Sequence, residues 1–193
     1  MEHKLEIGLL QIIAQNVRLP RSLIVDEVRV DAPSVIAIPP HNGEKLKASA
    51  GEQKLRVLIT EPNINAVLAV NIPESVPVRN LKVEVMSGKM KVSGHYKIAP
   101  FTVDAVPVIE NGVRVKIDLS GGKSGMFGMP SAMIGFIESE VNQKMKIDLS
   151  LLPFPVQLDA ITCEPGRVII TGRAKLSYPL PPALTGSSAF LPK

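Results

Sequence analysis

One cysteine and three histidines are the side chains here that could carry nucleophilic or metal chemistry: Cys163, His3, His41 and His95. A cysteine nucleophile needs a neighbouring base and a group that orients that base. No histidine stands in a sequence context that pairs it with Cys163, and the three lack the spacing of a zinc site. We therefore predict an unreactive Cys163 in a strand, a surface strand position for His95, and no catalytic residue, metal site or cofactor.

The segment Gly122-Lys123-Ser124 follows an expected strand and precedes an expected helix, which invites comparison with a phosphate-binding loop. That motif requires a glycine five residues before its last glycine, and Ile117 occupies this position. The sequence instead predicts a Gly-rich connector over residues 121–128. A second interpretation is a mobile apolar lip that carries Met126 and Phe127.

Carboxylate pairs are a further potential source of acid–base chemistry. Asp26 and Glu27 form one pair, and Glu138 and Glu140 form another. We interpret both as solvated faces of their elements. An enzyme acting on an apolar substrate stays as a remote alternative, because carboxylates from distant strands can also meet in a fold.

The composition describes an aliphatic protein. Of 193 residues, 45% are hydrophobic but only 4% aromatic, and tryptophan is absent. The mean hydropathy of +0.19 indicates either a large core or apolar surface with a purpose beyond packing. The net charge of +4 is dispersed, without the basic stripe and interleaved aromatics of a nucleic-acid-binding protein. Weak attraction to anionic membranes fits better, and nucleic acid is not a predicted partner.

Targeting signals do not stand out. The apolar stretch near the start is broken by Glu6 and Gln11, and no run is long enough to span a bilayer. We expect a cytoplasmic or peripheral membrane protein as the sequence is written, and an exported one if a leader was removed.

Three strand pairs, each folded at a glycine-containing turn, dominate the second half of the chain. The turns are Ser87-Gly88, Asn111-Gly112 and Glu164-Pro165-Gly166, and the pairs cover residues 81–98, 101–119 and 154–176. Asn-Gly favours a hairpin because both residues tolerate positive φ. Apolar and charged residues alternate along these strands, which predicts one dry and one wet face on each.

The other elements are read from spacing. Residues 5–13 fit either a short amphipathic helix or a strand, while residues 22–38 and 55–59 look extended. A helix is expected from Thr60, and a second from Pro130 with an apolar stripe that ends near Met145. We predict a single α+β domain over residues 1–178 and a Pro/Ser-rich tail over residues 179–193.

This order of elements resembles the LmeA-like phospholipid-binding proteins of the tubular lipid-binding (TULIP) superfamily. The segments "VDEVRVDAPSV", "LRVLITEPNINAVLA", "LKVEVMSGKMKVSG" and "IDLSLLPFPVQLDAITCEPGRVIITGRA" carry the resemblance, which spans about residues 24–176. It implies a strongly curved antiparallel sheet of successive hairpins wrapped around an amphipathic helix, with lipid chains between them. It implies no catalytic residues.

The leading hypothesis is non-enzymatic binding, and transfer, of a phospholipid or a fatty-acid-like ligand. The apolar residues expected to line the site come from both helices and from the dry strand faces. They are Ile64, Leu68, Val83, Val85, Met90, Val92, Val115, Ile117, Met133, Ile134, Ile137, Val141, Val168 and Ile170. The alternative is a structural or interaction module whose closed aliphatic core docks a protein partner or a membrane surface.

Overall fold

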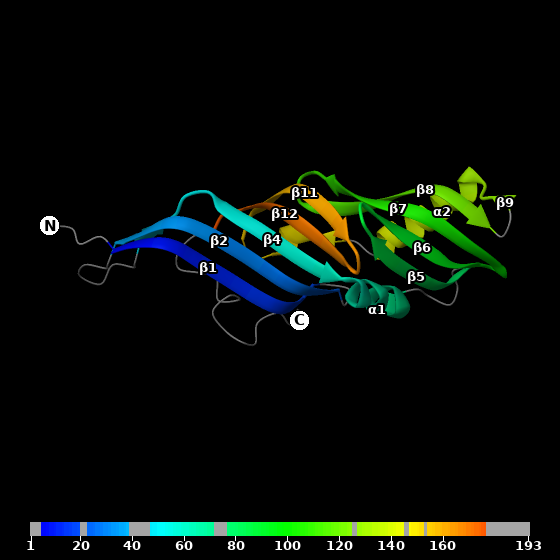
Figure 1. The fold of residues 1–193 in the computed structure, drawn as a ribbon, viewed down its shortest axis with the longest axis horizontal. Helices are drawn as coiled ribbons and strands as arrows, with labels where there is room; N and C mark the ends of the chain where they lie inside the picture. The colour runs from blue at the N-terminus through cyan, green and yellow to red at the C-terminus, as the bar shows by residue number, and fades with distance from the viewer. Residues whose placement is uncertain are drawn as a thin grey trace.

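The computed structural model describes residues 5–19, 23–38, 47–71, 77–124, 127–144, 147–152 and 154–176. These residues form two antiparallel sheets and two helices in an elongated arrangement (Figure 1). This confirms the predicted α+β class with a strongly curved antiparallel sheet. The predicted tail over residues 179–193 lies outside the described residues.

Sheet A forms one half of the molecule and contains the first long strands. Its strands are β1 (Leu5–Arg18), β2 (Ile24–Ile38), β3 (Lys47–Ser49), β4 (Gln53–Thr60), β11 (Val156–Glu164) and β12 (Arg167–Ala174). They are hydrogen-bonded in the order β1-β2-β4-β12-β11, and β3 pairs with β2. The last predicted hairpin therefore joins the first strands of the chain.

Sheet B forms the other half and is strongly curled. Its strands are β5 (Val78–Met86), β6 (Lys89–Tyr96), β7 (Ala99–Glu110), β8 (Arg114–Ser124), β9 (Phe127–Gly128) and β10 (Ile147–Asp148). The order is β10-β8-β7-β6-β5, with β9 paired to β8. Helix α1 (Glu61–Asn71) precedes this sheet in the chain, and α2 (Ser131–Lys144) follows β9. A 3-10 turn, Leu149–Leu151, follows β10.

The three predicted hairpins are confirmed, and their turns also join the two sheets. Gly88 donates its N–H to the Cys163 carbonyl of β11 at 3.0 Å, and Gly166 donates to Val85 of β5 at 2.9 Å. Leu158 of β11 donates to the Gly112 carbonyl at 2.7 Å. These backbone bonds make the turns junctions between the two sheets, and the positive φ of Gly88, Gly112 and Gly166 is one that glycine adopts readily.

The first segment is a strand, which decides between the two predicted alternatives. Its apolar residues lie on both faces because the pairing is interrupted opposite Ser34, a residue with φ of 55°. Ile7 pairs with the buried Val35, whereas Leu10 pairs with the buried Ala32. The inward-facing positions of β1 therefore change from odd-numbered to even-numbered residues between Ile7 and Leu10. Leu9 and Ile13, which contributed to the near-helical spacing in the sequence, lie on the outward face and are 53% and 51% exposed.

The predicted Gly-rich connector is wrong for residues 121–124. Gly122, Lys123 and Ser124 continue β8 and pair with the start of β7 after a bulge. A Cβ added at Gly122 would lie 2.9 Å from the Met129 Cβ, so the missing side chain lets the chain fold back closely. Gly125 and Met126, which belong to the predicted lip, lie outside the described residues.

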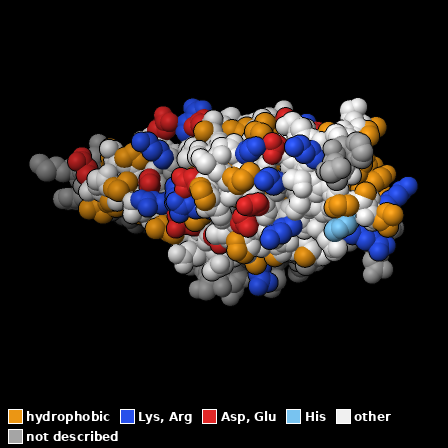
Figure 2. All heavy atoms as spheres, turned by 45° about the vertical axis from the view of Figure 1, so that its right-hand side comes forward, with side chains coloured by type: hydrophobic (Ala, Val, Ile, Leu, Met, Phe, Trp, Pro, Cys, Tyr) orange, Lys and Arg blue, Asp and Glu red, His pale blue; other side chains and the backbone are white. Residues whose placement is uncertain are grey.

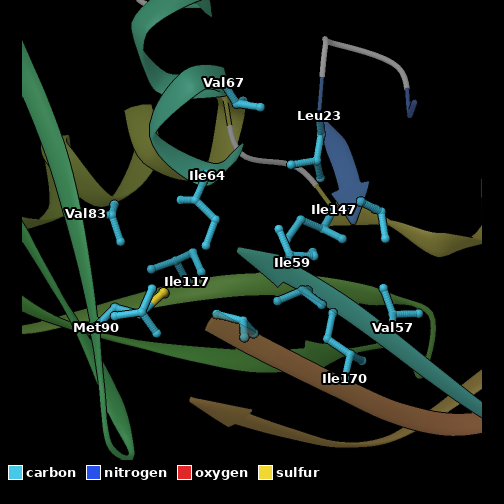
Figure 3. Close-up of a cluster of buried hydrophobic side chains, with 14 of the residues drawn as sticks. Leu23, Val57, Ile59, Ile64, Val67, Val83, Met90, Ile117, Ile147 and Ile170 are labelled. Atoms are coloured by element: carbon cyan, nitrogen blue, oxygen red, sulfur yellow. The ribbon is translucent and has the colours of Figure 1, made fainter. Parts of the chain in front are cut away.

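One aliphatic cluster fills the junction of the two sheets. Figure 3 shows side chains from both sheets and from α1 pointing toward one another, among them Ile64, Met90 and Ile170. The cluster continues along sheet B to α2, where Ile137 and Val141 are buried. A single core therefore runs through the part of the chain that the structure describes.

Candidate functional site

The apolar residues predicted to line a ligand site all belong to this core. Twelve of the fourteen are buried, while Met133 and Ile134 of α2 are partly buried against the same cluster. The structure therefore brings the set together from both sheets and both helices. Their contact with a lipid stays a prediction at this point.

Helix α1 is attached to the free edge of β5 by two side chains one helical turn apart. The Glu61 carboxylate accepts the Val85 N–H at 2.8 Å. The Asn65 amide accepts the Val83 N–H at 2.7 Å and donates to the Val83 carbonyl at 2.8 Å. These bonds satisfy edge-strand backbone groups that would otherwise need another strand or water.

Helix α2 is attached to β8 in the same manner. Glu138 accepts the Leu119 N–H at 2.9 Å. Asn142 accepts the Ile117 N–H and donates to the Ile117 carbonyl, both at 2.7 Å. In both helices a Glu is followed four residues later by an Asn, and their partners are two residues apart on the strand. We name these two arrangements the helix clamps.

The helix clamps close the curled sheet. Strand β5 is one edge of sheet B, and β8 near the other edge pairs with β9 and β10 only close to its ends, so the helices satisfy free backbone groups on both sides of the sheet. The sequence interpretation missed these residues and assigned Glu138 to a solvated face, which is wrong. A Glu-x-x-x-Asn spacing that occurs in both predicted helices is the signal that could have revealed them.

Asp26 is a second acidic residue wrongly assigned to a solvated face. Its carboxylate accepts the Thr60 N–H at 2.8 Å and the Thr60 hydroxyl at 3.1 Å. The contact fixes the junction at which β4 ends and α1 begins. The two bonds give this half-buried carboxylate its hydrogen-bond partners.

The apolar core reaches the surface along the first half of α2. Ile137 is 0% exposed, but Met133 and Ile134, one turn earlier, are only partly buried. Phe136 is 36% exposed and packs edge-on against Tyr96 of β6, with ring centroids 5.9 Å apart. Tyr96 itself packs against the core, so apolar surface leads from the interior to the outside at this end.

The nucleophile candidate is buried and far from His95, the one histidine among the described residues. Cys163 is 5% exposed, and burial raises the pKa of its thiol, which disfavours the thiolate. Its carbonyl bonds Gly88 at one end of β6, whereas the exposed His95 lies near the other end, about 20 Å along the strand. His3 and His41 lie outside the described residues.

Neither a metal site nor a membrane-spanning helix is present among the described residues. No group of three or more His, Cys, Asp or Glu is placed to hold a metal ion among them. No helix in the same part of the chain has both the length and the apolar character to cross a membrane.

Comparison with known families agrees with the geometry. The sequence model of the LmeA-like phospholipid-binding family matches residues 7–173. The chain belongs to the LmeA-like phospholipid-binding family. No curated protein and no solved structure matched the chain. Membership in a lipid-binding family gives the aliphatic core a functional context, and it suggests a non-enzymatic role. It gives the same context to the partly exposed apolar residues Met133, Ile134 and Phe136 of α2, which we name the outlet.

Proposed function

We propose that this protein binds a phospholipid, with the acyl chains between the curled sheet B and the helices that close it. The observation that carries the proposal is the apolar route along α2, where burial decreases from Ile137 through Ile134 to Phe136. A sealed hydrophobic core gains nothing from exposed aromatic and aliphatic groups along one outlet. A lipid chain entering there gains about 0.8 kcal/mol for each methylene removed from water.

The headgroup would stay at the outlet, because burying a phosphate without partners is costly. Exchange of the bound lipid with bilayers follows from the same arrangement. Met133 and Ile134 would contact the part of the acyl chain nearest the surface, and the buried residues of the site would contact the remainder.

The first experiment is extraction of the gently purified protein with organic solvent, followed by mass spectrometry. We expect a near-stoichiometric phospholipid. A protein that carries no lipid and takes up no phospholipid with a fluorescent acyl chain would refute the proposal and favour a closed-core interaction module.

A matched pair of variants places the lipid. Met133→Asp puts a charge on the apolar outlet, while Ala132→Asp puts the same charge on the neighbouring, exposed position of α2. We expect a several-fold loss of lipid uptake for Met133→Asp and wild-type uptake for Ala132→Asp. Ile137→Asp is a poorer test, because Ile137 is fully buried and an unpaired charge there would unfold the protein.

A further inference from the structure

One hairpin of sheet B turns with residues that do not favour a turn. The hairpins β5–β6, β7–β8 and β11–β12 use Ser-Gly, Asn-Gly and Pro-Gly, but β6–β7 turns at Lys97-Ile98. Lys97 has φ of 56°, a left-handed conformation that suits Gly or Asn better than Lys. Ile98 is 94% exposed, more than any other large hydrophobic residue whose side chain the structure describes. Stability alone does not account for these two residues.

The surroundings of this turn are basic. Arg79 pairs with His95 in the β5–β6 ladder, and Lys123 pairs with Thr102 in the β7–β8 ladder, next to the turn. All these basic side chains are exposed, and the described segments 77–83, 92–103 and 119–124 contain no Asp or Glu. Figure 2 shows basic and hydrophobic side chains next to one another at this end of the molecule.

An aromatic contact connects the turn with the apolar outlet. The Lys97 ammonium lies 5.9 Å from the centre of the Tyr96 ring, and that ring packs against Phe136 of α2. The exposed isoleucine, the basic side chains and the outlet therefore lie at one end of the elongated molecule. This end is opposite the one where β1 begins (Figure 1).

We propose that this end docks onto an anionic lipid bilayer, with Ile98 inserted among the acyl chains and the basic residues facing the headgroups. A lone exposed isoleucine flanked by cations suits a bilayer better than a protein partner, because a bilayer offers apolar depth beneath a layer of negative charge. The inference rests on the proposed lipid binding and adds the place where the protein meets its membrane.

The test is co-sedimentation of the full chain with vesicles of phosphatidylcholine alone and of phosphatidylcholine mixed with phosphatidylglycerol. We expect binding to the mixed vesicles that weakens with added salt, and weaker binding to phosphatidylcholine alone. Equal binding to both vesicle types would overturn the electrostatic part of the proposal.

The decisive variant converts the turn to Lys97→Asn with Ile98→Gly, which reproduces the sequence of the Asn111-Gly112 turn. Because Asn tolerates the positive φ of position 97 and Gly tolerates any φ at position 98, the melting temperature should change little. Removing the lysine charge weakens partitioning about fivefold, and removing the isoleucine side chain weakens it at least about tenfold. Wild-type binding by this folded variant would overturn the proposal.

A control variant tests whether any exposed apolar residue would serve. Ile13→Asp changes an isoleucine that is 51% exposed on β1, away from the basic end. The Ile13→Asp variant should bind mixed vesicles like the wild type, whereas Ile98→Asp should not. Equal loss of vesicle binding in both variants would overturn the assignment of Ile98 as the inserted residue.

The lipid content of the Lys97→Asn, Ile98→Gly variant separates the two proposals. Retained lipid with lost vesicle binding supports docking, whereas a wild-type protein without lipid refutes only the proposed function.

Discussion

Asn142→Ala should destabilise the protein through the backbone of β8 rather than through the core. The Asn142 amide makes two hydrogen bonds of 2.7 Å to the backbone N–H and carbonyl of Ile117. Ile117 is only 2% exposed. Each buried backbone group left without a hydrogen-bond partner lowers the free energy of unfolding by about 1–3 kcal/mol. Water that enters the space left by the side chain reduces this penalty. We therefore expect a loss of about 2–4 kcal/mol. For a domain of this size, that lowers the melting temperature by roughly 5–15 °C.

Thermal unfolding followed by circular dichroism measures the loss, and hydrogen exchange at the Ile117 amide shows where it occurs. Asn142→Asp is the informative control, because the carboxylate still accepts the N–H bond but faces the Ile117 carbonyl. Protonation would restore a donor, so the folded-state pKa of Asp at this position should lie above its unfolded value. The deficit relative to wild type should then be full at neutral pH and shrink as the pH falls toward about 4. An unchanged melting temperature in Asn142→Ala would refute the clamp interpretation.

Other predictions concern three separate positions. Burial opposes ionisation of Asp148, but bonds from Ser150 and Arg114 outweigh it and hold the pKa of this carboxyl below its usual value. The stabilisation from the ionised Asp148 is fully present above the pKa of this carboxyl in the unfolded chain. It is lost as the pH falls through the lower pKa of the folded protein. Asp148→Asn should thus be less stable in urea at neutral pH, and the difference should begin to shrink only as the pH falls below about 4. Cys163 should resist thiol reagents until the protein unfolds, and rapid labelling of the native protein would contradict its burial. Gly172→Ala should impair folding strongly, because the new Cβ would overlap the Gln157 carbonyl; a soluble variant of wild-type stability would exclude that contact.

Local patterns predicted the hairpins well, because their information is contained in a few neighbouring residues. Asn111 and Gly112 both have positive φ, as a tight turn of this type requires. The alternation of Val83 and Val85 with charged neighbours likewise fixed which face is buried. In these elements the turn chemistry and the period of two agree with each other.

The first strand could not be assigned from spacing, because its face changes where Gly8 lies opposite Ser34. A strand with apolar residues on both faces has no clean period of two. The same limit applies to the division into two sheets. That division depends on bonds such as Gly166 to Val85, which join residues far apart in the chain.

The helix clamps escaped prediction because polar residues on a helix normally indicate a face toward water. Glu61, Asn65, Glu138 and Asn142 instead satisfy the backbone of edge strands, and only the position of each helix beside a strand reveals this. Edge strands need such protection, and proteins supply it in several ways. Sequence reasoning therefore found apolar residues of the core but not the polar residues that attach the helices to the sheet.

Closure by helices has a consequence for how a lipid could enter. Strands β6 and β7 are joined by a continuous ladder, whereas α2 is held to the backbone of β8 by three side-chain hydrogen bonds from Glu138 and Asn142. At about 1 kcal/mol net for each bond, separating α2 from β8 costs far less polar bonding than parting two strands. Met133 and Ile134 of the same helix are only partly buried, and they lie one turn before the buried Ile137. If the proposed lipid is bound, the bonding favours the seam between α2 and β8 over a gap between strands as the route for its acyl chains.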